Sequence, residues 1–121
     1  MSGMQRVLLD TNALLMPFEF SLNLDLELRS LLGNCEILIP GPVIGELKRS
    51  KNKHARAALA LASKYPIHET SVQGDAGVIQ AAKELNAMVV SNDALMRKKL
   101  RQSGIRTIYL RSRSHLYFDD F

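Results

Sequence analysis

The 121-residue chain has one cysteine, three scattered histidines and no long apolar run. Each of these features excludes certain classes of site or protein. Cys35 alone cannot form an internal disulfide or a cysteine metal cluster, which fits a reducing cytoplasm and predicts a buried packing role. His54, His68 and His115 supply no zinc-ligand set. The apolar runs are too short for a membrane span or a secretory signal. We therefore expect one cytoplasmic domain, residues 1–121, with enough hydrophobic residues for a single core.

The positions of the cations are more informative than the net charge of +4. Most lysines and arginines fall in two clusters, one over residues 48–56 and one over residues 97–113. Basic clusters on an otherwise mixed chain are typical of proteins that bind a polyanion such as nucleic acid. The solvent-exposed face of an ordinary helix has a similar composition, so both interpretations stay open at this point.

Short apolar runs alternate with helical patterns along the chain. Strands are expected at 7–9, 36–40, 67–70, 87–91 and 105–110, and helices at 22–32, 43–50, 55–64, 76–85 and 94–102. Residues 16–21 are expected to form a loop, because Pro17 interrupts them. Residues 111–121 are expected to form a tail. Strands that alternate with helices indicate a parallel sheet with helices on both faces.

Four acidic residues occupy equivalent places relative to these strands. Asp10 and Asp93 directly follow the first and fourth strands, Glu46 lies in the helix after the second strand, and Asp75 opens the helix after the third. In a parallel sheet such positions meet at the carboxyl edge, where ligands bind. Each acid also has a structural alternative, since Asp10, Asp75 and Asp93 are suitable helix N-caps and Glu46 could be an exposed helix residue.

The chemistry of converging carboxylates points to a metal ion. Several carboxylates within a few ångströms repel one another unless a cation joins them. Ligand sets made only of oxygen favour Mg²⁺ or Mn²⁺. Such an ion can lower the pKa of a bound water and offset charge on a departing alkoxide. We therefore expect metal-assisted hydrolysis of a phosphodiester at this edge.

These motifs together resemble the PIN-domain ribonucleases, over nearly the whole chain. The motifs are Val7-Leu8-Leu9-Asp10-Thr11-Asn12, Val43-Ile44-Gly45-Glu46-Leu47, Asp75 and Val89-Val90-Ser91-Asn92-Asp93. The sequence is most similar to small archaeal PIN proteins related to ribosomal RNA processing factors, and more distantly to toxins of toxin-antitoxin pairs. The resemblance implies an α/β fold, a three-layer α/β/α sandwich with a five-stranded, mainly parallel sheet of order 3-2-1-4-5.

The resemblance also implies roles for single residues. By motif position, the catalytic residues and metal ligands would be Asp10, Glu46, Asp75 and Asp93, around Mg²⁺ or Mn²⁺. Thr11, Asn12, Ser91 and Asn92 would orient those carboxylates. Many relatives carry paired acids at the third motif, whereas here Ala76 and Gly77 follow Asp75, which leaves fewer ligands for a second metal ion.

The function implied is that of a metal-dependent endoribonuclease, active in ribosomal RNA processing or as a toxin-type RNase. The alternative is a non-catalytic RNA-binding or ribosome-assembly module that retains the fold. RNA would be guided by Lys48, Arg49, Lys51, Lys53, Arg97 and Lys98. Family analogy suggests a homodimer, with an antitoxin or a ribosomal precursor as a further partner. In the tail, Tyr117 and Phe118 could stack on bases, although docking of Leu116, Phe118 and Phe121 on the body or a second subunit is the favoured interpretation.

Overall fold

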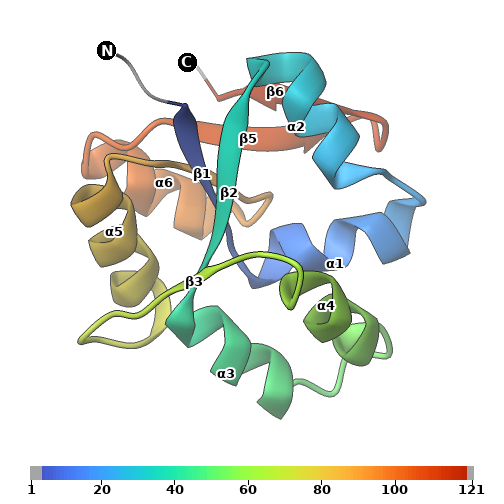
Figure 1. The fold of residues 1–121 in the computed structure, drawn as a ribbon, viewed down its shortest axis with the longest axis horizontal. Coiled ribbons are helices and arrows are strands. Elements are labelled where there is room, and N and C mark those ends of the chain that lie inside the picture. The colour runs from blue at the N-terminus through green and yellow to red at the C-terminus, as the bar shows by residue number, and fades with distance from the viewer. Residues whose placement is uncertain (1–3, 120–121) are drawn as a thin grey trace.

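The computed structural model describes residues 4–119, which form one sheet with helices on both sides (Figure 1). The strands are β1 (Gln5–Leu9), β2 (Cys35–Pro40), β3 (Ile67–His68), β4 (Met88–Val90), β5 (Thr107–Arg111) and β6 (His115–Phe118). Their order is β3-β2-β1-β4-β5-β6. The first five strands are parallel, which confirms the predicted α/β fold and the order 3-2-1-4-5, and β6 adds an antiparallel edge.

The central position of β1 follows from its sequence. Val7, Leu8 and Leu9 have no exposed surface, because β1 pairs with β2 on one side and β4 on the other while helices cover both faces. A run of consecutive apolar residues is what a strand buried on both faces requires. The polar residues that follow, beginning with Asp10, are thereby delivered to the centre of the carboxyl edge.

Within residues 4–119, six helices surround the sheet. They are α1 (Thr11–Phe20), α2 (Leu24–Leu32), α3 (Gly41–Arg49), α4 (Ala55–Ala62), α5 (Gly74–Leu85) and α6 (Ala94–Gln102). Figure 1 shows α5 and α6 on one side of the sheet and α1 and α2 on the other, with α3 leaving the carboxyl end of β2. None of the helices formed by residues 4–119 combines the length and apolarity needed to cross a membrane.

The expected loop at residues 16–21 is wrong, because α1 continues through Pro17 to Phe20. Proline cannot donate a backbone hydrogen bond to the preceding turn, which ordinarily disfavours it inside a helix. Residues 13–16 are all buried in the core, and this packing outweighs the lost bond. The helix ends where Ser21 adopts a left-handed conformation and its N–H donates to the Pro17 carbonyl.

The expected tail also differs in part, because residues 115–118 form β6 instead of an irregular segment. Leu116 is buried and Phe118 packs against the core, which confirms docking on the body, while Phe121 lies outside the described residues. The connecting turn has Ser112 and Arg113 at φ 53° and 61°. Such turns are normally marked by Asn-Gly or Asp-Gly, so the usual hairpin signal was absent from this sequence.

The single cysteine lies at the start of β2. Cys35 is 3% exposed and belongs to the hydrophobic core, as its predicted packing role requires. Burial raises the pKa of its thiol, which keeps it protonated and unreactive.

Candidate active site

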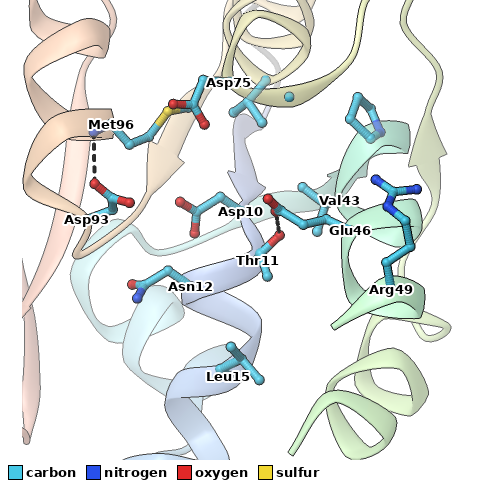
Figure 2. A pocket seen from close by; sticks show the side chains of 13 residues that line it. Asp10, Thr11, Asn12, Leu15, Val43, Glu46, Arg49, Asp75, Asp93 and Met96 are labelled. Carbon is cyan, nitrogen blue, oxygen red and sulfur yellow. Dashed lines mark hydrogen bonds between the residues drawn. The ribbon is translucent and has the colours of Figure 1, made fainter. Parts of the chain in front are cut away.

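A pocket of about 300 Å³ opens at the carboxyl edge of the sheet (Figure 2). Asp10, Glu46, Asp75 and Asp93 all line it, although they come from four separate parts of the chain. Figure 2 shows Asp10 between Asp93 on one side and Glu46 on the other. The structure therefore brings together the four acids that the sequence places after successive strands.

Asp10 is the most buried of these acids, with 8% of its surface exposed. Its Oδ1 accepts a hydrogen bond from the Ala13 N–H at 2.8 Å and so caps α1. Burial raises the pKa of Asp10 to about 7, the hydrogen bonds from Ser91 and Ala13 oppose that shift, and the negative charges of Asp93 and Glu46 add to it. Asp10 is thus a buried carboxylate in a negative environment, which a bound cation would stabilise in its charged form.

Asp93 repeats this arrangement at α6. Its Oδ1 accepts from the Leu95 and Met96 N–H groups at 2.9 and 3.1 Å. The Ser91 hydroxyl accepts a hydrogen bond from the Asp93 N–H at 3.1 Å. The same Ser91 side chain is hydrogen-bonded to Asp10, so one buried hydroxyl links the two acids. Asp10 and Asp93 therefore each cap a helix and line the pocket at the same time. Both roles are compatible because a carboxylate has two oxygens.

Glu46 and Asp75 reach the pocket from the helices of its other walls. Glu46 is on α3, and the Thr11 hydroxyl donates a hydrogen bond to its Oε1. Asp75 is in the first turn of α5, whose N-cap residue is Gln73, so the N-cap alternative for Asp75 is wrong. Its Oδ2 accepts from the Lys99 ammonium at 3.0 Å instead.

The four residues expected to orient the carboxylates divide into two kinds. Thr11 and Ser91 contact carboxylates directly. Asn12 and Asn92 bond to backbone: the Asn12 Oδ1 accepts from the Asn92 N–H at 2.8 Å, and the Asn92 side chain bonds the N–H and carbonyl of Leu110 at 2.6 and 3.1 Å. The amides thus join the ends of β1, β4 and β5, and act on the acids through the main chain.

The expected RNA-binding cations differ in their distance from the pocket. Arg49 lines it, one turn beyond Glu46 on α3. Lys48 and Lys53 line a separate depression between α3 and α4, and Lys51 and Lys98 are exposed. Arg97 lies over the Tyr109 ring, 4.5 Å from its centroid, and donates to Asp119 at 3.2 Å, so its position is explained by packing at the β5 edge.

Lys99 belongs to the basic cluster expected to guide RNA, but its pairing with Asp75 was not predicted. The apolar walls of the pocket, which include Leu15, Val43, Val78 and Met96, were not predicted either. A signal for Lys99 was present, since Asp93, Met96 and Lys99 follow one another at intervals of three and share one face of α6. That face looked like part of a basic amphipathic helix, so its relation to Asp75 was not apparent from the sequence.

The carboxylate oxygens that line the pocket are the ligand type that a hard divalent cation prefers. Asp10, Glu46 and Asp93 provide carboxylate oxygens around one pocket and are close enough for the latter two to act on the ionisation of Asp10. Within residues 4–119, no three acidic, histidine or cysteine side chains already stand in the arrangement of a metal site. The residues therefore fit Mg²⁺ or Mn²⁺ by type and location.

This fold and this acidic edge define a PIN-type domain. The family model described as "PIN like domain" matches residues 7–113, and the chain belongs to that family. It is similar to Ribonuclease VapC4 of Methanocaldococcus jannaschii, with 32% identity over 130 residues covering 98% of each chain. It is also similar to Ribonuclease VapC9 of Archaeoglobus fulgidus, with 30% identity over 117 residues covering 91% of this chain and 86% of that protein.

A solved structure shows the same fold. The PIN domain endonuclease Utp24 superposes with a TM-score of 0.82, covering 96% of this chain and 92% of that one, at 19% identity. The family predicted from the sequence motifs is therefore confirmed by the family model, the curated relatives and the fold.

Proposed function

We propose that this protein is a metal-dependent endoribonuclease that hydrolyses RNA phosphodiester bonds at the four-carboxylate pocket. The observation that carries the proposal is that Asp10, Glu46, Asp75 and Asp93 line one pocket at the carboxyl edge of the sheet. Both curated relatives are named ribonucleases, which favours cleavage over a purely structural role.

Asp10, Glu46 and Asp93 would hold Mg²⁺ or Mn²⁺, with Asp75 at the rim of the same pocket. A bound ion would supply an activated water and offset negative charge on the phosphate and the leaving oxygen. The chain itself orients the carboxylates: Ser91 joins Asp10 to the backbone of Asp93, and Thr11 holds Glu46. These bonds limit the rearrangement that the acids must undergo when an ion arrives.

The RNA backbone would approach along the basic residues beside the pocket. Arg49 is the cation on the pocket wall, so it is placed to bind the phosphate nearest the carboxylates. Lys48 in the last turn of α3, and Lys51 and Lys53 in the segment after it, would bind the RNA backbone farther from the carboxylates, and Lys98 would contribute from α6. Because Arg97 is held by Asp119 and Tyr109, its contribution to RNA affinity should be the smallest of the six.

Cleavage of a structured RNA in Mn²⁺ tests the proposal. Asp10→Asn and Asp93→Asn should each reduce the rate by about a hundredfold or more, because each removes a charged ligand. Glu19→Gln is the matched control, since Glu19 is an exposed acid on the far part of α1. Wild-type rates in both aspartate variants would reject the nuclease proposal.

A non-catalytic RNA-binding module is the second candidate, and metal titration separates the two. That module would bind RNA without cutting it and would show no calorimetric signal for Mn²⁺ at the acidic edge.

For a nuclease, a toxin role predicts an antitoxin gene directly upstream, whereas RNA maturation predicts none. The homodimer expected by family analogy is tested by measuring the mass of the protein in solution.

A further inference from the structure

A lysine from α6 reaches the rim of the pocket and pairs with the one acid that stands apart from the others. The Lys99 Nζ lies 3.0 Å from the Asp75 Oδ2. The charges that act on Asp10 come from Asp93 and Glu46, whereas Asp75 is engaged by Lys99. The pocket therefore presents three carboxylates that act on one another and a fourth, Asp75, that is paired with a lysine.

The two partners are held very differently. Asp75 belongs to a rigid wall, because α5 approaches α3 so closely at Gly77 that an added Cβ would lie 2.5 Å from the Val72 carbonyl oxygen and 2.6 Å from a Pro42 ring carbon. Lys99 reaches Asp75 through a long flexible side chain from the α6 face that also carries Met96 into the pocket. Lys99 is therefore the partner that can move.

The ion pair is also exposed enough to exchange. The side chains of Lys99 and Asp75 are 42% and 48% exposed, and pairs of this kind are only weakly stabilising in water. An ammonium group is a compact charge that pairs with a phosphate oxygen as readily as with a carboxylate. An RNA phosphate at the pocket mouth would therefore compete with Asp75 for Lys99.

We propose that Lys99 is a positioning residue that keeps Asp75 paired in the RNA-free protein and transfers to an RNA phosphate when substrate binds, which frees Asp75 for a metal ion. This inference rests on the proposed function. It makes RNA binding and metal binding mutually favourable, because each ligand removes one partner of the same ion pair. Bound RNA would thus favour assembly of the full set of four acids around the ion.

The first test is a calorimetric Mn²⁺ titration of the RNA-free protein. Lys99→Met should bind Mn²⁺ about fivefold more tightly than the wild type, the change expected from removing one exposed ion pair that competes with the metal. Lys98→Met is the matched control, because it removes the same charge from the next position of α6, which is exposed. Equal Mn²⁺ affinities for wild type and Lys99→Met, or equal increases for both variants, would overturn the inference.

The second test measures RNA binding in EDTA by fluorescence anisotropy, where no metal contributes. Asp75→Asn should bind RNA more tightly than the wild type, since Lys99 is released, and Lys99→Met should bind it more weakly. Lys99→Met should thus bind Mn²⁺ more tightly and RNA more weakly than the wild type. An ion pair with a structural role alone would not change the two affinities in opposite directions. Unchanged RNA affinity in Asp75→Asn would contradict the exchange.

The outcomes for Lys99 and for the nuclease proposal can be told apart. If Asp10→Asn loses cleavage while Lys99→Met leaves Mn²⁺ affinity unchanged, the nuclease proposal is supported. Only the proposed transfer of Lys99 from Asp75 to RNA is then rejected. Circular dichroism of each variant checks that the fold is retained before either binding measurement is interpreted.

Discussion

The side-chain oxygen of Asn12 accepts a hydrogen bond from the backbone N–H of Asn92 at 2.8 Å, although the two residues are 80 positions apart. This bond joins the first turn of α1, which follows β1, to the loop between β4 and α6. Asp10 and Asp93, the N-cap residues of α1 and α6, lie beside it, so the contact sets the spacing of two carboxylates without touching either of them.

Asn12→Ala should therefore reduce both stability and cleavage. The Asn92 N–H would lose its acceptor in a partly buried loop, which costs about 1–3 kcal/mol of unfolding free energy. Urea unfolding and cleavage rates measure the two effects. Asn34→Ala, at an exposed turn before β2, should change stability by less than about 0.5 kcal/mol. If Asn12→Ala behaves like that control, the Asn12–Asn92 bond does not organise the site.

Thr11→Val should weaken metal binding while the fold is retained. Valine has nearly the shape of threonine but cannot donate to Glu46, so the carboxylate loses the group that orients it. Bonds of this kind to metal ligands are worth about 10–100-fold in metal affinity. A Mn²⁺ titration measures the loss, and Thr11→Ser, which keeps the hydroxyl, should restore most of the affinity. No difference between the valine and serine variants would contradict this role.

The pH dependence of stability should reveal the burial of Asp10. Its pKa rises from 3.8 to about 7 on folding, so between these values the folded protein binds more protons than the unfolded chain. The free energy of unfolding of the metal-free protein should therefore fall as pH rises through this range, by an amount on the order of 4 kcal/mol from this group.

Urea unfolding in EDTA at about pH 5 and about pH 8 measures this dependence. Asp10→Asn keeps an acceptor for the Ala13 N–H but removes the titrating charge, so it should be less sensitive to pH and more stable than the wild type at the higher pH. The exposed-acid control Glu19→Gln should follow the wild type. A variant with the same pH dependence as the wild type would show that Asp10 does not carry the effect.

Gly77→Ala should destabilise the protein by about 1–3 kcal/mol, because the added methyl group meets the Val72 backbone and the Pro42 ring. Gly45→Ala is the matched control on α3, where the added Cβ would lie 3.1 Å from the end of the flexible Arg49 side chain. That control should be neutral or stabilising by up to about 1 kcal/mol, as alanine favours helix. Thermal unfolding compares the two, and equal effects would contradict the close approach of α5 to α3.

The sequence predicted the parts of this protein that depend on local pattern. Val7, Leu8 and Leu9 could be interpreted as a central strand because they are consecutive and apolar, and the polar residues after them had to lie at the sheet edge. Asp93 was placed by the same logic after β4. Alternation of strands and helices predicted a parallel sheet with helices on both faces, whereas the strand order 3-2-1-4-5 came from the resemblance to PIN domains.

The features that the sequence did not predict depend on tertiary contacts. Pro17 stays helical because its neighbours are buried, and β6 forms although its turn lacks glycine and asparagine. The bonds of Asn92 to Leu110 and of Lys99 to Asp75 join residues whose proximity exists only after the sheet has formed. No local spacing rule identifies such partners.

The most direct test of the account is a crystal structure of the protein soaked in Mn²⁺, with anomalous scattering used to locate the ion. The account predicts a manganese peak in the pocket, bound by oxygens of Asp10, Glu46 and Asp93. An ion bound elsewhere, or a pocket that stays free of manganese at saturating concentration with its carboxylates turned apart, would contradict it.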